Sequence, residues 1–472
     1  MGVPSTERSL LNHTSEPDFL KEQENVTNAM PERTLSLPFG RGMLTYGTSE
    51  SVPAGPLNIP DFDFRVKMIP TNTTYDLDSS LNPPEFKDWS EFSNGVASAL
   101  KLGEQLNVDE SWIMLNKPTK NVMSPRHSGL MLGLGLNGHL KSMWLGHIQK
   151  FLEPKNEFMT IGTMLGVSIS YAGDPPERLV GAFSLHIPAI LPSHQLEFNL
   201  SGLTQAAGLF SLGVLHLGTR QRRQAEMLLG EIGGRDVPTN DGKSNVRGSY
   251  SLSAALGFGL VMLAKGKEAT SPSETQMITK LRHYIHGDKH RSNETDVEYD
   301  ALDVNFTSPG ASLALGMWFL KSERSDVAPL MDLPCNPTEL DWIRPDFLLF
   351  RTLSKNLIMW NTIGRDREWV ESQIPHFIQI ALERKKERFE SVDDNIELAY
   401  YNIVAGACLA QGLKFAGTAE DDTFKCLLHY MDIFTQAASI KCRCYYNALT
   451  HSNNPQPSLM KVKSSVQRLD QV

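Results

Sequence analysis

The 472-residue sequence lacks several features that assign chains to familiar classes. It has only five cysteines, of which Cys335, Cys408 and Cys426 are isolated. Cys442 and Cys444 are close together but have no second pair of ligands, so neither a disulfide framework nor a zinc site is expected. We therefore predict no metal ion and no other cofactor.

Long apolar runs and excess positive charge are also missing. No apolar stretch reaches the roughly eighteen residues of a membrane-spanning helix, and the acidic residues 1–30 lack the apolar core of a signal peptide. The formal net charge is −9, since 54 acidic residues outnumber 45 lysines and arginines. Binding nucleic acid requires a basic face. We expect an intracellular chain that binds neither membranes nor nucleic acid.

Catalytic and phosphate-binding signatures are incomplete. Residues 133–138 match G-x-G-x-x-G, but the match lies inside an apolar segment and not between a strand and a helix. The triplet at 242–244 resembles the end of a phosphate loop, but Val237 occupies a position that must be glycine. Neither G-x-S-x-G nor H-E-x-x-H occurs. The sequence thus predicts no catalytic residue and no small-molecule substrate.

Glycine is present at ordinary abundance but is unevenly placed. Of the 35 glycines, 18 fall within six apolar segments of 91 residues in total, at 128–140, 159–173, 203–218, 250–266, 309–321 and 401–417. Each segment has small residues followed by an apolar residue and glycine, or by Gln-Gly in the last, weaker copy, and several have another glycine five residues later. The gap after Gly316 leaves room for one degenerate copy near 347–360. A recurring phrase of this kind indicates a repeat protein.

Most of the glycine-rich segments are followed by a more amphipathic one, at 178–187, 220–232, 274–285, 369–382 and 424–438. Paired helices at roughly forty-residue intervals predict an all-α fold, either an α/α toroid or an open α-solenoid. Buried strands remain an alternative for each apolar run, although period-2 alternation is absent.

The glycines need a physical reason, because glycine inside a helix costs about 0.5–1 kcal/mol relative to alanine. Close packing between neighbouring helices offsets that cost through dispersion contacts. We predict that the repeat glycines lie at helix–helix contacts: Gly133, Gly138, Gly166, Gly213, Gly218, Gly257, Gly316, Gly412 and Gly417.

Composition divides the chain into four regions. Residues 1–40 are predicted to be a disordered arm. Residues 41–90 are predicted to be a proline-rich, irregular linker with one or two edge strands near 62–69. The helical array is predicted over 91–440, and 441–472 is a polar, divergent tail.

An α/α-toroid enzyme is the alternative from another functional class. Such enzymes use paired carboxylates for acid–base chemistry. The six repeat segments contain no aspartate or glutamate. If these segments line a ring, they offer it no carboxylates, which speaks against this alternative.

The repeats and several non-repeat phrases resemble the proteasome/cyclosome-repeat scaffold families, and the subunit 1 family of the anaphase-promoting complex more than the proteasome regulatory-particle scaffolds. The phrases that carry the resemblance are LPFGRGM at 37–43, NGVA at 94–97, NKP at 116–118, GLGLNGHL at 133–140, HIPAILP at 186–192, AEMLLGEIG at 225–233 and PDFLLFRTL at 345–353. It covers roughly 35–440. A proteasome scaffold, the runner-up, would have a long charged helical rod before the repeats.

The resemblance implies a non-catalytic scaffold that organises other subunits and co-activator docking in a cell-cycle ubiquitin ligase of the nucleus and cytoplasm. Family members are much longer, so we expect a fragment, a truncated form or an incomplete gene model. Independently, three Ser-Pro dipeptides suit a proline-directed mitotic kinase, which makes Ser124, Ser271 and Ser308 candidate phosphosites.

Overall fold

A computed structural model describes residues 61–63, 65–68, 71–76, 84–102, 108–117, 124–152, 156–191, 200–234, 244–269, 271–287, 302–388 and 393–451. The described part is predominantly helical, which confirms the all-α prediction. It forms two compact units. Unit 1 holds the described residues up to Leu217 together with 244–253, and unit 2 holds 218–234 and 254–451.

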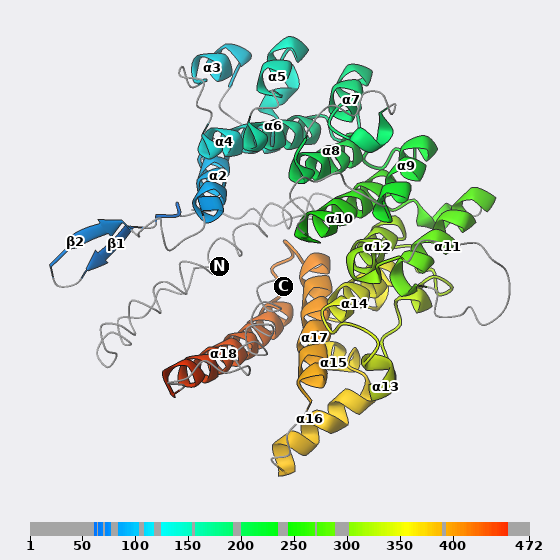
Figure 1. Ribbon diagram of the computed structural model, residues 1–472. Coiled ribbons are helices and arrows are strands. Elements are labelled where there is room, and N and C mark those ends of the chain that lie inside the picture. Colours follow the sequence, from blue (N-terminus) through cyan, green and yellow to red (C-terminus); the bar gives the residue numbers. More distant parts are fainter. Residues whose placement is uncertain are drawn as a thin grey trace. The chain divides into compact units, whose positions relative to one another are not determined.

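Unit 1 consists of two layers of helices. Its inner helices follow one another in contact: α2 (Pro84–Leu100), α4 (Pro125–Leu136), α6 (Glu157–Ser170) and α8 (Gly202–Leu215). The outer helices lie on one side of α4, α6 and α8 (Figure 1): α3 (Glu110–Leu115), α5 (Leu145–Phe151) and α7 (Glu177–Ser184). Short 3-10 turns, η2 (His139–Ser142) and η3 (Pro188–Ile190), belong to the connections. The paired arrangement is the one expected from alternating small-residue and amphipathic segments.

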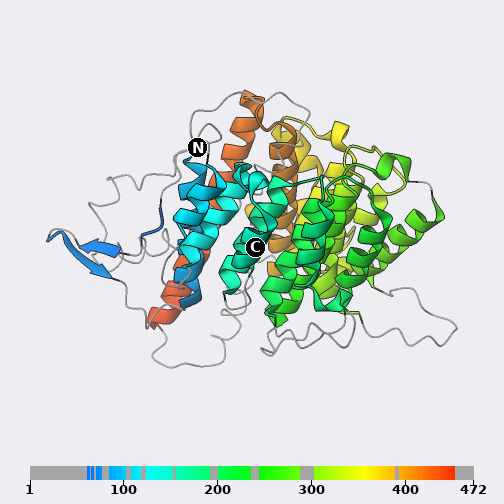
Figure 2. The same cartoon turned by 90° about the horizontal axis from the view of Figure 1, so that it is seen from above.

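Unit 2 repeats the plan. Beyond α10 (Ser244–Val261), whose last residues belong to unit 2, its inner helices are α12 (Val304–Trp318), α14 (Phe347–Ile358) and α17 (Asp394–Lys414), which contact one another in that order and lie side by side in Figure 2. The remaining helices are α9 (Arg222–Ile232), α11 (Pro272–His286), α13 (Pro337–Leu340), α15 (Arg367–Ser372), α16 (His376–Arg388) and α18 (Asp421–His451). The 3-10 turns are η5 (Gly266–Glu268), η6 (Ala328–Met331) and η7 (Trp360–Thr362). The degenerate copy expected near 347–360 is helix α14 with η7.

Polar side chains fix where most inner helices begin. The first turn of a helix leaves backbone N–H groups without partners, and a side-chain oxygen at the N-cap accepts from one of them. Ser124 accepts from the N–H of His127, and Asn156 from that of Met159. The same role is played at α8, α12 and α17 by Ser201, Asp303 and Asp393. Local sequence therefore defines these helix starts independently of the packing.

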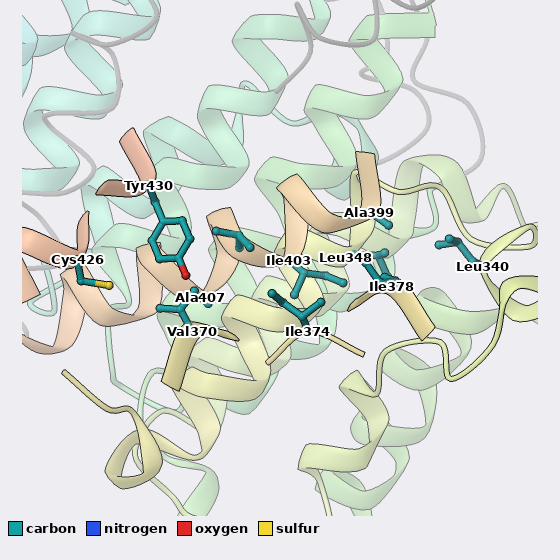
Figure 3. Packing of buried hydrophobic residues seen from close by; sticks show 11 residues of the cluster. Leu340, Leu348, Val370, Ile374, Ile378, Ala399, Ile403, Ala407, Cys426 and Tyr430 are labelled. Carbon is teal, nitrogen blue, oxygen red and sulfur yellow. The ribbon is translucent and has the colours of Figure 1, made fainter. Parts of the chain in front are cut away.

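The largest described cluster of unit 2 lies between its inner and outer layers. Ile403 and Ala407 of α17 pack with Val370 and Ile374 of the outer segment (Figure 3), and the full cluster adds Leu340, Leu348, Ile378, Ala399, Val404, Cys426 and Tyr430. Fully burying an aliphatic side chain contributes about 1.5–3 kcal/mol. The amphipathic segments thus contribute to stability mainly by covering the small-residue helices.

The edge-strand expectation falls on a short hairpin. Strand β1 (Arg65–Met68) pairs antiparallel with β2 (Thr73–Asp76), with Arg65 opposite Asp76. Two boundaries differ from the composition-based division: α2 begins at Pro84, before position 91, and α18 extends to His451, past position 440. Composition blurs helix ends, because a helix starts at a local residue such as Pro84, which suits a first turn. The predicted arm, 1–40, and residues 452–472 of the predicted tail lie outside the described residues.

Candidate interaction site

The repeat glycines of unit 1 lie where helices approach closely. A Cβ on Gly133 would lie 2.5 Å from the Cβ of Ala99 on α2, and one on Gly166 would lie 2.5 Å from the carbonyl oxygen of Met131 on α4. Gly129, in the same contact as Gly133, is tighter still, at 1.8 Å from the carbonyl oxygen of Phe92. Real Cβ atoms do not approach backbone so closely, so only glycine permits this spacing.

Unit 2 also has glycines at close helix contacts, but on α17 the contact falls on a different glycine from the predicted one. A Cβ on Gly316 would lie 2.8 Å from the Cβ of Ser354 on α14. On α17 the close approach falls on Gly406, at 2.5 Å from the carbonyl oxygen of Leu349, whereas Gly412 has only a Leu427 methyl carbon at 3.9 Å. Gly257 lies buried in α10, and Gly213 is buried in α8 of unit 1. The helical glycines are therefore not equivalent: some are required by the packing and Gly412 is not.

The glycines that follow five residues later do something different. Gly138, Gly218 and Gly417 have φ of 80°, 65° and 76°, the left-handed region that suits glycine. Each lies just after the end of an inner helix, where Ala264 and Lys321 take the same conformation after α10 and α12. Sequence reasoning assigned these glycines to packing. Their position just past the last apolar residue, a common C-terminal signal, could have identified them as turn residues.

The turns also join successive inner helices through the main chain. In unit 1 the N–H of Gly173, itself at φ 80°, donates to the carbonyl of Leu215 at 3.1 Å. In unit 2 the N–H groups of Gly218, Ala264 and Lys321 donate to Leu260, Met317 and Leu357, respectively, at 2.9, 3.0 and 3.0 Å. These bonds satisfy carbonyls that a helix end otherwise leaves free. The turns at Gly173, Gly218, Ala264 and Lys321 thereby fix the position of one helix end relative to the next, whereas the N–H of Gly138 donates to Gly135 of its own helix.

An ion pair braces the turn that carries Arg220. The Nη2 and Nε atoms of Arg220 donate to one carboxylate oxygen of Glu274, at 2.6 and 3.0 Å. Glu274 is buried, and together with Ser271 it forms a capping box at the start of α11. Burial by itself raises the pKa of Glu274, but hydrogen bonds from Ser271 and Arg220 outweigh it and hold the pKa below its ordinary value. The carboxylate is therefore ionised at neutral pH.

The three candidate phosphosites lie in different surroundings. Ser124 is exposed at the N-cap of α4. Ser271 donates its hydroxyl to Glu274 at 2.7 Å, so a phosphate there would meet a carboxylate. Ser308 is fully buried in α12 and donates to the carbonyl of Ile285 at 3.0 Å, so a kinase reaches it only after local unfolding.

Exposed apolar side chains gather on particular elements. In unit 1 they include Trp112 and Leu115 of α3, and Trp144 just before α5, which is 65% exposed; Leu185 and Leu203 are exposed elsewhere. Glu110 ties these elements together, because it accepts from the N–H of Trp144 at 2.9 Å and contacts Nδ1 of His147 at 2.6 Å. Unit 2 exposes Leu409 of α17 and, on one stripe of α18, Phe424, Leu428 and Met431. Such residues suit protein–protein contact.

The described residues contain no group of His, Cys, Asp or Glu that could hold a metal ion. The G-x-G-x-x-G match lies within α4 and its following turn, which is not the strand-to-helix setting that dinucleotide binding requires. Within the described ranges, no helix combines the length and apolarity needed to span a bilayer.

Comparisons with known proteins agree along the chain. Residues 3–172 match the family description "APC1 fourth domain" and residues 177–462 match "APC1 fifth domain". Anaphase-promoting complex subunit 1 of Homo sapiens is 36% identical over 433 residues, covering 88% of this chain and 22% of that protein. The Schizosaccharomyces pombe protein of the same name is 32% identical over 454 residues, covering 94% of this chain and 29% of its own length. An Emericella nidulans relative named "Negative regulator of mitosis" is 33% identical over 438 residues, covering 91% of this chain and 20% of that protein.

Proposed function

Because this chain belongs to the anaphase-promoting complex subunit 1 family, we propose that it acts as a non-catalytic scaffold segment within that complex. The chain spans about a fifth to a third of the length of the curated relatives it matches. The observation that carries the proposal is the match of consecutive family domains across both units. The alternatives, a proteasome scaffold and a toroid enzyme, are not favoured by these comparisons.

The structure supports a scaffold through what its helices provide. The inner helices contact each other through glycine and main-chain bonds, which suits a rigid support. Exposed aromatic and aliphatic side chains on α3, α5 and α18 provide contact surface for other proteins. We assign the binding of other subunits, and of the co-activator, to surfaces of this kind. We place the chain in the nucleus and cytoplasm.

Affinity purification of the tagged 472-residue chain, followed by mass spectrometry, tests the proposal. We expect other anaphase-promoting complex subunits to be recovered with the wild-type chain and with Gly181→Ala, whose added methyl group meets no atom within 4 Å. Gly129→Ala, which forces α2 and α4 apart, is expected to recover them poorly. Recovery of no subunit by the folded wild-type chain contradicts the assembly proposal and leaves family membership intact.

A further inference from the structure

Arg351 on α14 is a buried cation for which the structure offers no counter-charge. The residue is 4% exposed, and its Nε has no hydrogen-bond partner. Across the described residues, no ion pair or hydrogen bond reaches its guanidinium. Lys355, one turn further along the same helix, is paired with Asp332 at 2.8 Å. Unpaired burial of a charge is costly, so a cation in this position calls for an explanation.

The elements in contact with α14 offer Arg351 no free carboxylate. The residues after α15 meet α14 where Asn356 donates to Gln373 at 3.4 Å, and of the two acids of α15, Glu371 is paired with Arg367 at 3.7 Å and Glu368 is exposed. Helix α12 and the turns η6 and η7 contain no acidic residue. The acids of α17, Asp394 and Glu397, lie in its first turn. Gly406 marks where α17 packs against Leu349 and Thr352, beside Arg351, and at 1.5 Å per residue this point is about 13 Å from Glu397 along the helix.

Nearby acids on other segments are already engaged. Asp346, at the start of α14, is bound by the guanidinium of Arg344 at 2.5 Å. Asp332 holds Lys355. Burial lowers the pKa of Arg351 only to about 10, so the group is still protonated at neutral pH. The positive charge therefore persists without compensation from the described part of the chain.

A second polar group on the same face lacks a partner. Ser354 is fully buried, and its Oγ has no hydrogen-bond partner. Residues three apart on a helix are neighbours on one face. Buried polar groups in native proteins are nearly always satisfied, and exceptions often mark a site completed by something else. Ser354 packs against Gly316 of α12 inside the contact between the two helices, so the guanidinium of Arg351 is the group left to meet a partner.

We propose that Arg351 binds a carboxylate group of a partner polypeptide. A guanidinium matches a carboxylate in a bidentate geometry. One guanidinium compensates a single negative charge, whereas a dianionic phosphate calls for a second cation, and the nearest one on α14, Lys355, is engaged by Asp332. The carboxylate belongs to an acidic side chain or to a chain terminus. This assignment is independent of which complex the chain joins.

The proposal makes opposite predictions for stability and for binding. Met keeps the length and the apolar stem of arginine but removes the unpaired charge. Arg351→Met is therefore expected to raise the melting temperature of the isolated 472-residue chain by about 2 °C and to abolish carboxylate binding. If Arg351 had a purely structural role, its replacement by methionine would lower the melting temperature. Arg351→Lys is expected to retain weak binding without the bidentate geometry.

Thermal unfolding with three short probes tests this. One peptide has an internal glutamate and blocked ends, the second replaces that glutamate by glutamine, and the third has the glutamine sequence with a free C-terminal carboxylate. We expect one or both carboxylate probes, at millimolar concentration, to raise the melting temperature of the wild-type chain by about 2 °C, with no effect of the neutral probe. The probe that acts identifies the source of the carboxylate.

Lys355→Met provides the matched control, since it removes an exposed cation from the same helix. Its response to the probes is expected to equal that of the wild-type chain. The proposal is overturned if no carboxylate probe acts on the wild-type chain, if Arg351→Met responds as the wild-type chain does, or if Arg351→Met melts at a lower temperature than the wild-type chain.

Discussion

At the scale of single residues, the repeat glycines have two roles, close helix packing and left-handed turns. The sequence pattern alone does not distinguish them. Gly129 permits contact between α2 and α4, and an added Cβ would lie 1.8 Å from a backbone oxygen. Gly129→Ala is expected to lower the free energy of unfolding by about 1–3 kcal/mol, measured by urea titration, because rigid backbone must move. Gly230→Ala on α9 is the control: its methyl group meets no atom within 4 Å, so it should stabilise by about 0.5–1 kcal/mol. Equal effects of the two changes would contradict the packing role.

The left-handed turn residues give a second prediction at this scale, in which two substitutions change the free energy of unfolding in opposite directions. Ala264 and Gly218 share the left-handed conformation, with φ of 56° and 65°. A side chain in this region costs about 1–2 kcal/mol. Ala264→Gly should therefore raise the free energy of unfolding by about 1 kcal/mol, and Gly218→Ala should lower it by a similar amount. Chemical denaturation measures both, and a destabilising Ala264→Gly would show that the turn tolerates alanine without strain.

At the scale of elements, the start of α11 depends on one buried carboxylate. Glu274 is buried, but Arg220 is partly exposed and also pairs with Glu268, so the loss is smaller than for a fully buried pair. Glu274→Gln is expected to destabilise unit 2 by about 1–2 kcal/mol at pH 7. Because the folded pKa of Glu274 lies below its ordinary value of 4.5, its contribution is present above pH 4.5 and is lost as pH falls through the folded pKa. Denaturation across pH 3–7 should show the wild-type chain and the variant converging at the acidic end. A constant difference would exclude linkage through Glu274.

Sequence predicts elements well here and sites less well. The small-residue phrase locates α4, α6, α8, α12 and α17. Glycine and alanine recur inside helices where close packing against a neighbouring helix offsets their cost. The phrase misses α14 as a clear copy, since this helix contains no glycine or alanine. It also does not reveal that Gly412 lies outside the tight helix contacts, with only a Leu427 methyl carbon at 3.9 Å from an added Cβ. Whether a helix face meets a neighbour depends on three-dimensional register, which a single sequence does not contain.

At the scale of the whole molecule, contacts between repeats are local. In arrays of this kind stability is close to a sum of repeat and nearest-neighbour terms. Gly129→Ala should reduce amide hydrogen-exchange protection in α2, α4 and α6 and leave α12, α14 and α17 unchanged. Gly406→Ala, whose Cβ would lie 2.5 Å from the carbonyl oxygen of Leu349, should do the reverse. Exchange measured by mass spectrometry distinguishes this from a uniform loss of protection, which would indicate one cooperative folding unit.

The left-handed turns have a consequence for how such a chain diverges. Their bonds to the next inner helix use main-chain donors and acceptors, so they do not depend on side-chain identity. Successive turn residues that make such bonds are 46 positions apart between Gly218 and Ala264 but 57 apart between Ala264 and Lys321. Extra length is accommodated in the connecting segments and leaves the step between helices unchanged. Insertions and substitutions can thus accumulate between the turns while the spacing of the inner layer is inherited intact.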